Sequence, residues 1–71
     1  MKTLDEYMAM DYHMEIVEDK EEGGYVISYR DLPGCITSGE TIKEAINNAL
    51  DAKREWLIAA LEDGAEINEP K

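Results

Sequence analysis

The stretch "TIKEAINNALDAKREWLIAALEDG", residues 41–64, decides the fold. Thr41 and Glu44 form the T-x-x-E pattern of a helix capping box, and Gly64 is placed to end the helix. The apolar residues between them recur at helical spacing and form one broad stripe, as in a helix that lies on a sheet. They are Ile42, Ala45, Ile46, Ala49, Leu50, Trp56, Leu57, Ala60 and Leu61. We therefore expect one long amphipathic helix.

Two positions in this helix break the amphipathic pattern. Lys53 projects near the middle of the apolar stripe, and Ile58 projects from the polar face, which also carries Asn47, Asp51 and Glu62. A lysine can extend its ammonium to solvent, and a lone exposed isoleucine is common. Together they suggest that one monomeric core does not explain the helix. Because the chain is also small, we expect a homodimer or higher homo-oligomer with Ile58 at the contact.

Upstream of the helix, two segments alternate between apolar and polar residues. In residues 11–19, "DYHMEIVED", one face carries Tyr12, Met14 and Ile16, and in residues 24–31, "GYVISYRD", one face carries Tyr25, Ile27 and Tyr29. The polar segment "EDKEEGG", residues 18–24, joins them and ends in two glycines, which reach positive φ easily. This pattern predicts a β-hairpin.

The segment "DLPGCITSGET", residues 31–41, joins the hairpin to the helix. Pro33 and Gly34 fit the central positions of a type II turn, and residues 35–38 can form a third strand before Gly39. Residues 3–10 predict a short helix, and a brief edge strand could pass through residues 65–67. We expect a single domain over residues 1–71 of the α+β class. It is a three- to four-stranded antiparallel sheet with one long helix packed on it, in the order β-β-β-α-β after the short N-terminal helix.

Composition narrows the classes of function. The 71 residues include 17 acidic and 7 basic side chains, a formal net charge of −10. Such a surface repels nucleic acids and anionic membranes and favours basic partners. The single cysteine cannot form an internal disulfide, and the chain contains no apolar run of signal-peptide or membrane-span length. We therefore expect a cytoplasmic protein with no direct nucleic acid or membrane binding.

The residues capable of catalysis do not form a recognisable site. A nucleophilic thiol needs a neighbouring imidazole, lysine or helix N-terminus, and acidic surroundings would raise the pKa of Cys35 instead. His13, the single histidine, cannot form a zinc site alone. We expect Cys35 to be a buried apolar residue, and we expect neither enzyme activity nor a cofactor.

One enzymatic alternative stays open at this point. Glu15, Asp31 and Asp51 could converge on magnesium, which would make the chain a carboxylate-dependent nuclease. Acidic residues are abundant here, however, so such a triplet also arises by chance.

The acidic hairpin tip is the candidate binding site. A solvated loop alone explains such carboxylates more often than not, and the functional alternative is electrostatic recognition of a basic surface. For that alternative we add the aspartate at which the second strand ends. The expected partner-binding residues are Glu18, Asp19, Glu21, Glu22 and Asp31.

Residues 23–64 together resemble the HicB antitoxin family. The resemblance rests on Gly24-Tyr25, on Leu32-Pro33-Gly34-Cys35, and on the Gly39-x-Thr41 entry to a helix with Ala45, Ala49, Trp56 and a closing Glu-Asp-Gly. It extends over about residues 12–70. It implies a partial RNase H-like fold without nuclease activity. It also implies a partner, a small basic HicA-like toxin that cleaves mRNA and whose active site the antitoxin of this type II toxin–antitoxin system covers.

Many members of that family continue into a C-terminal helix-turn-helix or ribbon-helix-helix domain that binds DNA. This chain ends at Lys71, and its long helix carries no basic stripe. We therefore expect no operator binding by this chain alone.

Overall fold

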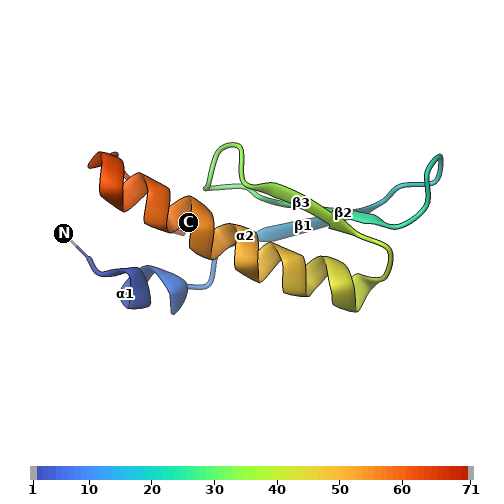
Figure 1. Ribbon diagram of the computed structural model, residues 1–71, viewed down its shortest axis with the longest axis horizontal. Coiled ribbons are helices and arrows are strands. Elements are labelled where there is room, and N and C mark those ends of the chain that lie inside the picture. The colour runs from blue at the N-terminus through green and yellow to red at the C-terminus, as the bar shows by residue number, and fades with distance from the viewer. Residues whose placement is uncertain (1, 71) are drawn as a thin grey trace.

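Residues 2–70 of the computed structural model form a three-stranded antiparallel sheet with a long helix across one face (Figure 1). In chain order the elements are α1 (Leu4–Met8), β1 (Met14–Glu18), β2 (Tyr25–Tyr29), β3 (Ile36–Gly39) and α2 (Ile42–Asp63). The strands lie side by side in the order β1-β2-β3. The expected α+β class, with a short N-terminal helix and one long helix, is confirmed.

The register of the sheet turns one face of each strand toward the helix. β1 pairs with β2 from Met14 opposite Tyr29 to Glu18 opposite Tyr25, and β2 pairs with β3 from Tyr25 opposite Gly39. Ile27 and Tyr29 are buried on the inner face, as their alternation predicts. α2 packs on β2 and β3, whereas neither helix packs on β1.

The expected bounds of α2 are confirmed, with one difference in its cap. The Thr41 hydroxyl accepts a hydrogen bond from the Glu44 N–H (3.1 Å), as in a capping box. The Glu44 carboxylate, however, accepts from the N–H of Glu40 (3.3 Å) and not from that of Thr41. Gly64 ends the helix in the left-handed conformation, with φ of 66°.

The connection from β2 to α2 contains the predicted turn and a tight contact. The Cys35 N–H donates to the Leu32 carbonyl (3.0 Å), and Gly34 has φ of 82°, as a type II turn requires. β3 runs one residue later than expected and ends at Gly39. A Cβ atom built on Gly39 would lie 2.5 Å from the backbone nitrogen of Ala45, so the first turn of α2 can pack here only against a glycine.

Lys53 is buried and joins α1 to α2. Its Nζ donates to the carbonyls of Met8 (3.3 Å) and Met10 (3.2 Å), and it lies 5.1 Å from the ring centroid of Tyr12 and 5.9 Å from that of Tyr29. Its position in the apolar stripe is therefore explained within one chain, so it does not indicate a second copy. α1 itself begins with a complete capping box between Thr3 and Glu6, which the sequence reading missed.

The expected fourth strand through Ala65 and Ile67 does not form, since residues 65–70 contain no strand. Contacts with distant residues hold this tail instead. The Tyr12 hydroxyl donates to the Asn68 carbonyl (2.6 Å), and the Asn68 side-chain amide donates to the Asp31 carbonyl (3.2 Å). Within residues 2–70 neither helix is long and apolar enough to cross a membrane.

Candidate functional site

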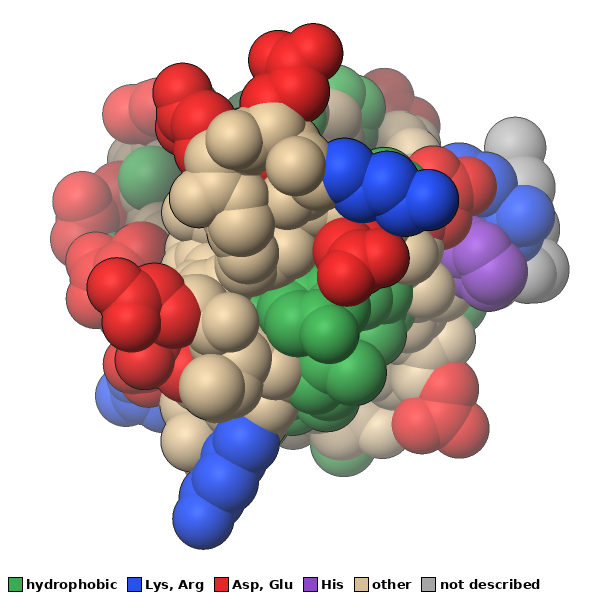
Figure 2. All heavy atoms as spheres, turned by 90° about the vertical axis from the view of Figure 1, so that its right-hand side faces the viewer, with side chains coloured by type: hydrophobic (Ala, Val, Ile, Leu, Met, Phe, Trp, Pro, Cys, Tyr) green, Lys and Arg blue, Asp and Glu red, His purple; other side chains and the backbone are tan. Residues whose placement is uncertain are grey.

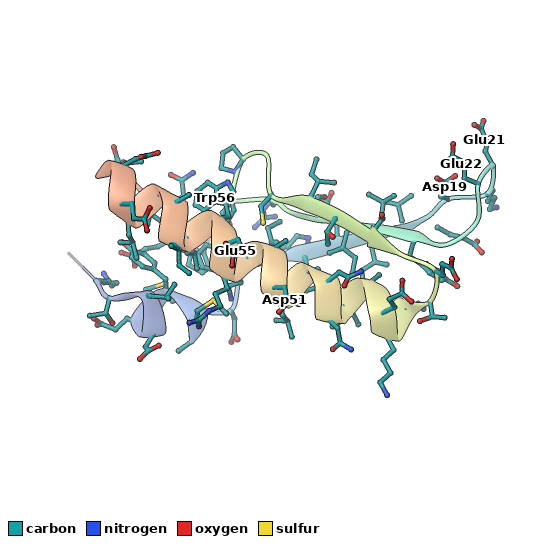
Figure 3. The ribbon with its side chains drawn as sticks, viewed as in Figure 1. Asp19, Glu21, Glu22, Asp51, Glu55 and Trp56 are labelled. Atoms are coloured by element: carbon teal, nitrogen blue, oxygen red, sulfur yellow. The ribbon has the colours of Figure 1, made fainter. Side chains whose placement is uncertain are left out.

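Acidic side chains from two separate parts of the chain gather at one end of the molecule, which we call the acidic end. It consists of Glu18, Asp19, Glu21, Glu22, Glu40 and Glu44. The register brings them together, because Tyr25 lies opposite Gly39. The residues that precede Tyr25, in the hairpin tip, therefore lie beside the residues that follow Gly39. Figure 3 shows the tip carboxylates projecting beyond the sheet.

Asp19 gives the hairpin tip its shape. Its carboxylate accepts hydrogen bonds from the N–H groups of Glu21 (3.1 Å) and Glu22 (3.2 Å). Its backbone bonds to both glycines of the tip, donating to the Gly24 carbonyl and accepting from the Gly23 N–H, each at 2.9 Å. Asp19 is therefore a structural residue as well as a charge, a role that an Asx turn explains.

The acidic end surrounds an open hollow of about 430 Å³. Asp19, Glu22, Glu40 and Glu44 contribute carboxylates to it; Tyr25 and Val26 contribute apolar surface. Figure 2 looks onto this end and shows acidic side chains around an apolar patch. Within residues 2–70 none of the carboxylates of the acidic end belongs to an ion pair. A long cationic side chain has the reach and charge to enter such a hollow.

Glu40 and Glu44 were missed by the sequence reading, and Asp31 does not join the site. Asp31 follows β2 at the strand end opposite the hairpin tip and is only 8% exposed. It lies outside the acidic end, and its part in partner binding stays a prediction. Ile58, expected at an oligomer contact, is half-buried on α2, and its role stays a prediction.

The carboxylates of the nuclease alternative do not converge. Glu15 lies on the sheet face turned away from α2, Asp31 is buried, and Asp51 is exposed on the outer side of α2 (Figure 3). Among residues 2–70 no group of three or more His, Cys, Asp or Glu side chains is arranged to hold a metal ion. The geometry on which a two-metal nuclease depends is absent from these residues.

Cys35 is placed as an apolar residue. It is 4% exposed, and burial raises the pKa of its thiol, with a smaller opposite influence from the Lys53 ammonium. A buried thiol with a raised pKa is a poor nucleophile. His13 is exposed beside the start of β1, where its ring meets solvent.

Comparison with known proteins adds the following similarities. Residues 12–71 match the family model described as the HicB-like antitoxin of bacterial toxin–antitoxin systems. The chain is 47% identical over 53 residues to Antitoxin HicB 1 of Photorhabdus laumondii, and 44% identical over 48 residues to Antitoxin HicB of Escherichia coli K12. It is also 44% identical over 48 residues to a UPF0150 protein of Thermoplasma acidophilum.

These matches cover different shares of the relatives. They span 75% of this chain and 32% of the Photorhabdus antitoxin, and 68% of this chain and 32% of the Escherichia coli antitoxin. The Thermoplasma match spans 68% of both proteins. The chain thus corresponds to about a third of the two named antitoxins.

Proposed function

The chain belongs to the HicB-like antitoxin family of bacterial toxin–antitoxin systems, and from this premise we propose that it neutralises a small basic HicA-like toxin that cleaves mRNA. The antitoxin binds over the toxin's active site and denies RNA access to it. A ribonuclease presents positive charge to phosphates, and a folded acidic surface can occupy the same place.

One observation carries the proposal: the acidic end gathers carboxylates that have no ion-pair partner within residues 2–70 around a hollow with an apolar wall. Unpaired surface charge costs little in water, but it attracts an oppositely charged partner and accelerates association. The formal net charge of −10 acts in the same direction. Tyr25 and Val26 add contact area that a purely electrostatic loop would lack.

In this function the chain binds and performs no chemistry of its own. The Cys35 thiol is buried, and the Glu15, Asp31 and Asp51 carboxylates lie apart. The same negative charge opposes direct binding of RNA or DNA to the chain. We therefore expect Cys35→Ser to leave neutralisation intact.

The test compares two charge reversals of equal size. The first changes Glu18, Glu21 and Glu22 to lysine and spares Asp19, because Asp19 holds the tip. The second changes Asp51, Glu55 and Glu62 to lysine, three exposed residues of α2 that do not line the hollow; Figure 3 shows the first two. Each variant is titrated against a purified HicA-like toxin in an RNA-cleavage assay.

We expect the tip reversal to weaken inhibition at least about tenfold, since like charges would then face each other across the interface. The α2 reversal should change it far less. Parent inhibition should also weaken as salt rises from about 0.05 to 0.3 M. Equal losses in the two variants would mean that overall charge and not the acidic end drives binding. Parent protein that leaves RNA cleavage unaffected would remove the proposed function itself.

A further inference from the structure

Within residues 2–70, β1 pairs with β2 along one edge, and its other edge is open. The Arg30 N–H donates to the His13 carbonyl (3.2 Å) and the Asp19 N–H donates to the Gly24 carbonyl (2.9 Å), which marks hydrogen-bonded pairs at both ends of the β1–β2 ladder. Such pairs alternate along an antiparallel ladder. Between them, Met14, Ile16 and Glu18 therefore direct their N–H and C=O groups away from β2, toward the open edge.

The opposite edge of the sheet is partly covered. Along β3, the Ser38 carbonyl points outward and accepts a hydrogen bond from the Asn48 side chain (2.8 Å), and α2 packs against the strand. β1 has no such cover within residues 2–70, because neither helix packs on it. Ile16 and Val17 on β1 are 44% and 62% exposed, and Ile36 on β3 is 63% exposed, so the two edges differ in the packing of α2 and not in side-chain exposure. Unprotected edge strands are the usual sites of strand addition.

We propose that β1 pairs with β1 of a second copy, antiparallel about a two-fold axis at Ile16, and joins the two sheets into one. In this register Ile16 lies opposite Ile16 of the second copy, Met14 opposite Glu18, and Glu15 opposite Val17. All three outward-directed residues then exchange backbone hydrogen bonds with the second copy. No carboxylate directly faces another, which removes the like-charge penalty of cross-strand pairs.

The order of residues in β1 favours a second copy over a different protein. The strand reads Met-Glu-Ile-Val-Glu, so reversing its direction places an apolar residue opposite each glutamate. Such self-complementarity is what an isologous two-fold contact requires. The Asn48 side chain reaches β3, so Asn48 marks the flank of α2 on that side. Ile46 and Leu50 lie about half a turn around the helix from Asn48, on the flank toward β1. Leu50 is 45% exposed on that flank. The β1 strand of the second copy would extend the sheet face that α2 covers, and so would lie beneath Leu50.

The salt dependence of the affinity distinguishes this dimer contact from toxin binding. Both copies carry a formal net charge of −10, so they repel each other and screening should strengthen the dimer. Association with a basic toxin should instead weaken with salt. The dimer proposal is independent of the proposed function, and each can fail without the other.

The first test is sedimentation equilibrium of the parent chain and of Ile16→Pro at about 0.15 and 0.5 M salt. Proline at this position removes an outward N–H while the ladder bonds to β2 remain, as is tolerated on an edge strand. We expect a parent dimer that tightens with salt and an at least about tenfold weaker dimer in Ile16→Pro. The Ile58→Ser variant should dimerise like the parent. A monomeric parent, or a dimer that depends on Ile58 and not on Ile16, would overturn the proposal.

The second test is disulfide formation, which needs no loss of structure. Residues in a hydrogen-bonded pair have Cα atoms about 5.5 Å apart, within disulfide reach. In a Cys35→Ser background, Ile16→Cys should therefore cross-link to itself on mild oxidation. A mixture of Glu15→Cys and Val17→Cys should form the mixed dimer faster than either variant alone. Glu21→Cys, at the tip, should not cross-link. Failure of the Ile16→Cys link, or equal rates at all sites, would contradict the register even if Ile16→Pro fails to fold.

Discussion

The two halves of α2 lie in opposite chemical surroundings. Its first turn adds Glu44 to the acidic end, where carboxylates surround an open hollow and form no ion pair within residues 2–70. Further along, Lys53 is 5% exposed and is held by two carbonyls and two tyrosine rings. Charge with fixed internal partners supports the architecture. Charge without them is available to another molecule, so the two halves should respond differently to substitution.

The largest effect should come from Gly39, where the acidic end meets the core. In Gly39→Ala the new Cβ would lie 2.5 Å from the Ala45 nitrogen and 2.7 Å from its Cα, and backbone atoms cannot move aside as a flexible side chain can. We expect a loss of about 3 kcal/mol in the free energy of unfolding, measured in urea. Gly64→Ala is the control. It has positive φ but no close contact and should cost about 1 kcal/mol. Equal losses would show that β3 and α2 separate easily.

Removing Lys53 should have the next largest effect. Lys53→Ala deletes a buried aliphatic stem, two hydrogen bonds to carbonyls and the contacts with Tyr12 and Tyr29. We expect a loss of about 2–3 kcal/mol in the free energy of unfolding. Lys43→Ala, at an exposed position on the same helix, should change it by less than about 0.5 kcal/mol. Similar values for the two variants would mean that Lys53 does not join α1 to α2.

The dependence of stability on alkaline pH is a second test of the role of Lys53. Burial lowers the pKa of Lys53 below 10.5, so the unfolded chain holds this proton more tightly than the folded one. Stability should therefore rise with pH between the lowered native pKa and 10.5. Burial raises the pKa values of Tyr12 and Tyr29, which has the opposite effect. Because Lys53→Met retains both tyrosines, the difference between its pH profile and that of the parent should isolate the lysine.

The elements that could be predicted from sequence are those set by local patterns. The periodicity of residues 41–64, the alternation of the hairpin strands and the turn at Pro33-Gly34 each depend on neighbouring residues. The tail was mispredicted because distant contacts decide its conformation: Asn68 bonds with Tyr12 and with Asp31. Lys53 was noticed as an exception, but its carbonyl partners lie more than forty positions away in sequence.

Part of the candidate site could likewise be predicted from local sequence, and part depends on distant contacts. The hairpin tip was identified from its composition, whereas Glu40 and Glu44 join it through the pairing of Tyr25 with Gly39. Applying antiparallel register to the predicted strands would have found Glu40, since residues after β3 must lie beside residues before β2. The burial of Asp31, at the other end of β2 from the tip, could not be read from the sequence. The structural role of Asp19 has a sequence signal, since aspartate commonly bonds the backbone N–H two residues ahead in turns.

The smallest effect on stability should come from the hairpin tip. The lysine reversal of Glu18, Glu21 and Glu22 leaves Asp19 and its two hydrogen bonds in place, and it breaks no ion pair within residues 2–70. Exposed charges contribute little to folding, so the free energy of unfolding should change by less than about 0.5 kcal/mol. At low salt it should rise slightly, because the reversal reduces the repulsion within a chain of formal net charge −10. Adding Asp19→Ala should lower the free energy of unfolding by about 1 kcal/mol more, since two N–H groups lose their acceptor. Thermal melting of both variants at about 0.02 and 0.3 M salt measures these differences. A tip reversal that destabilises the fold as much as Lys53→Ala would mean that these carboxylates stabilise the fold and do not simply form a binding surface.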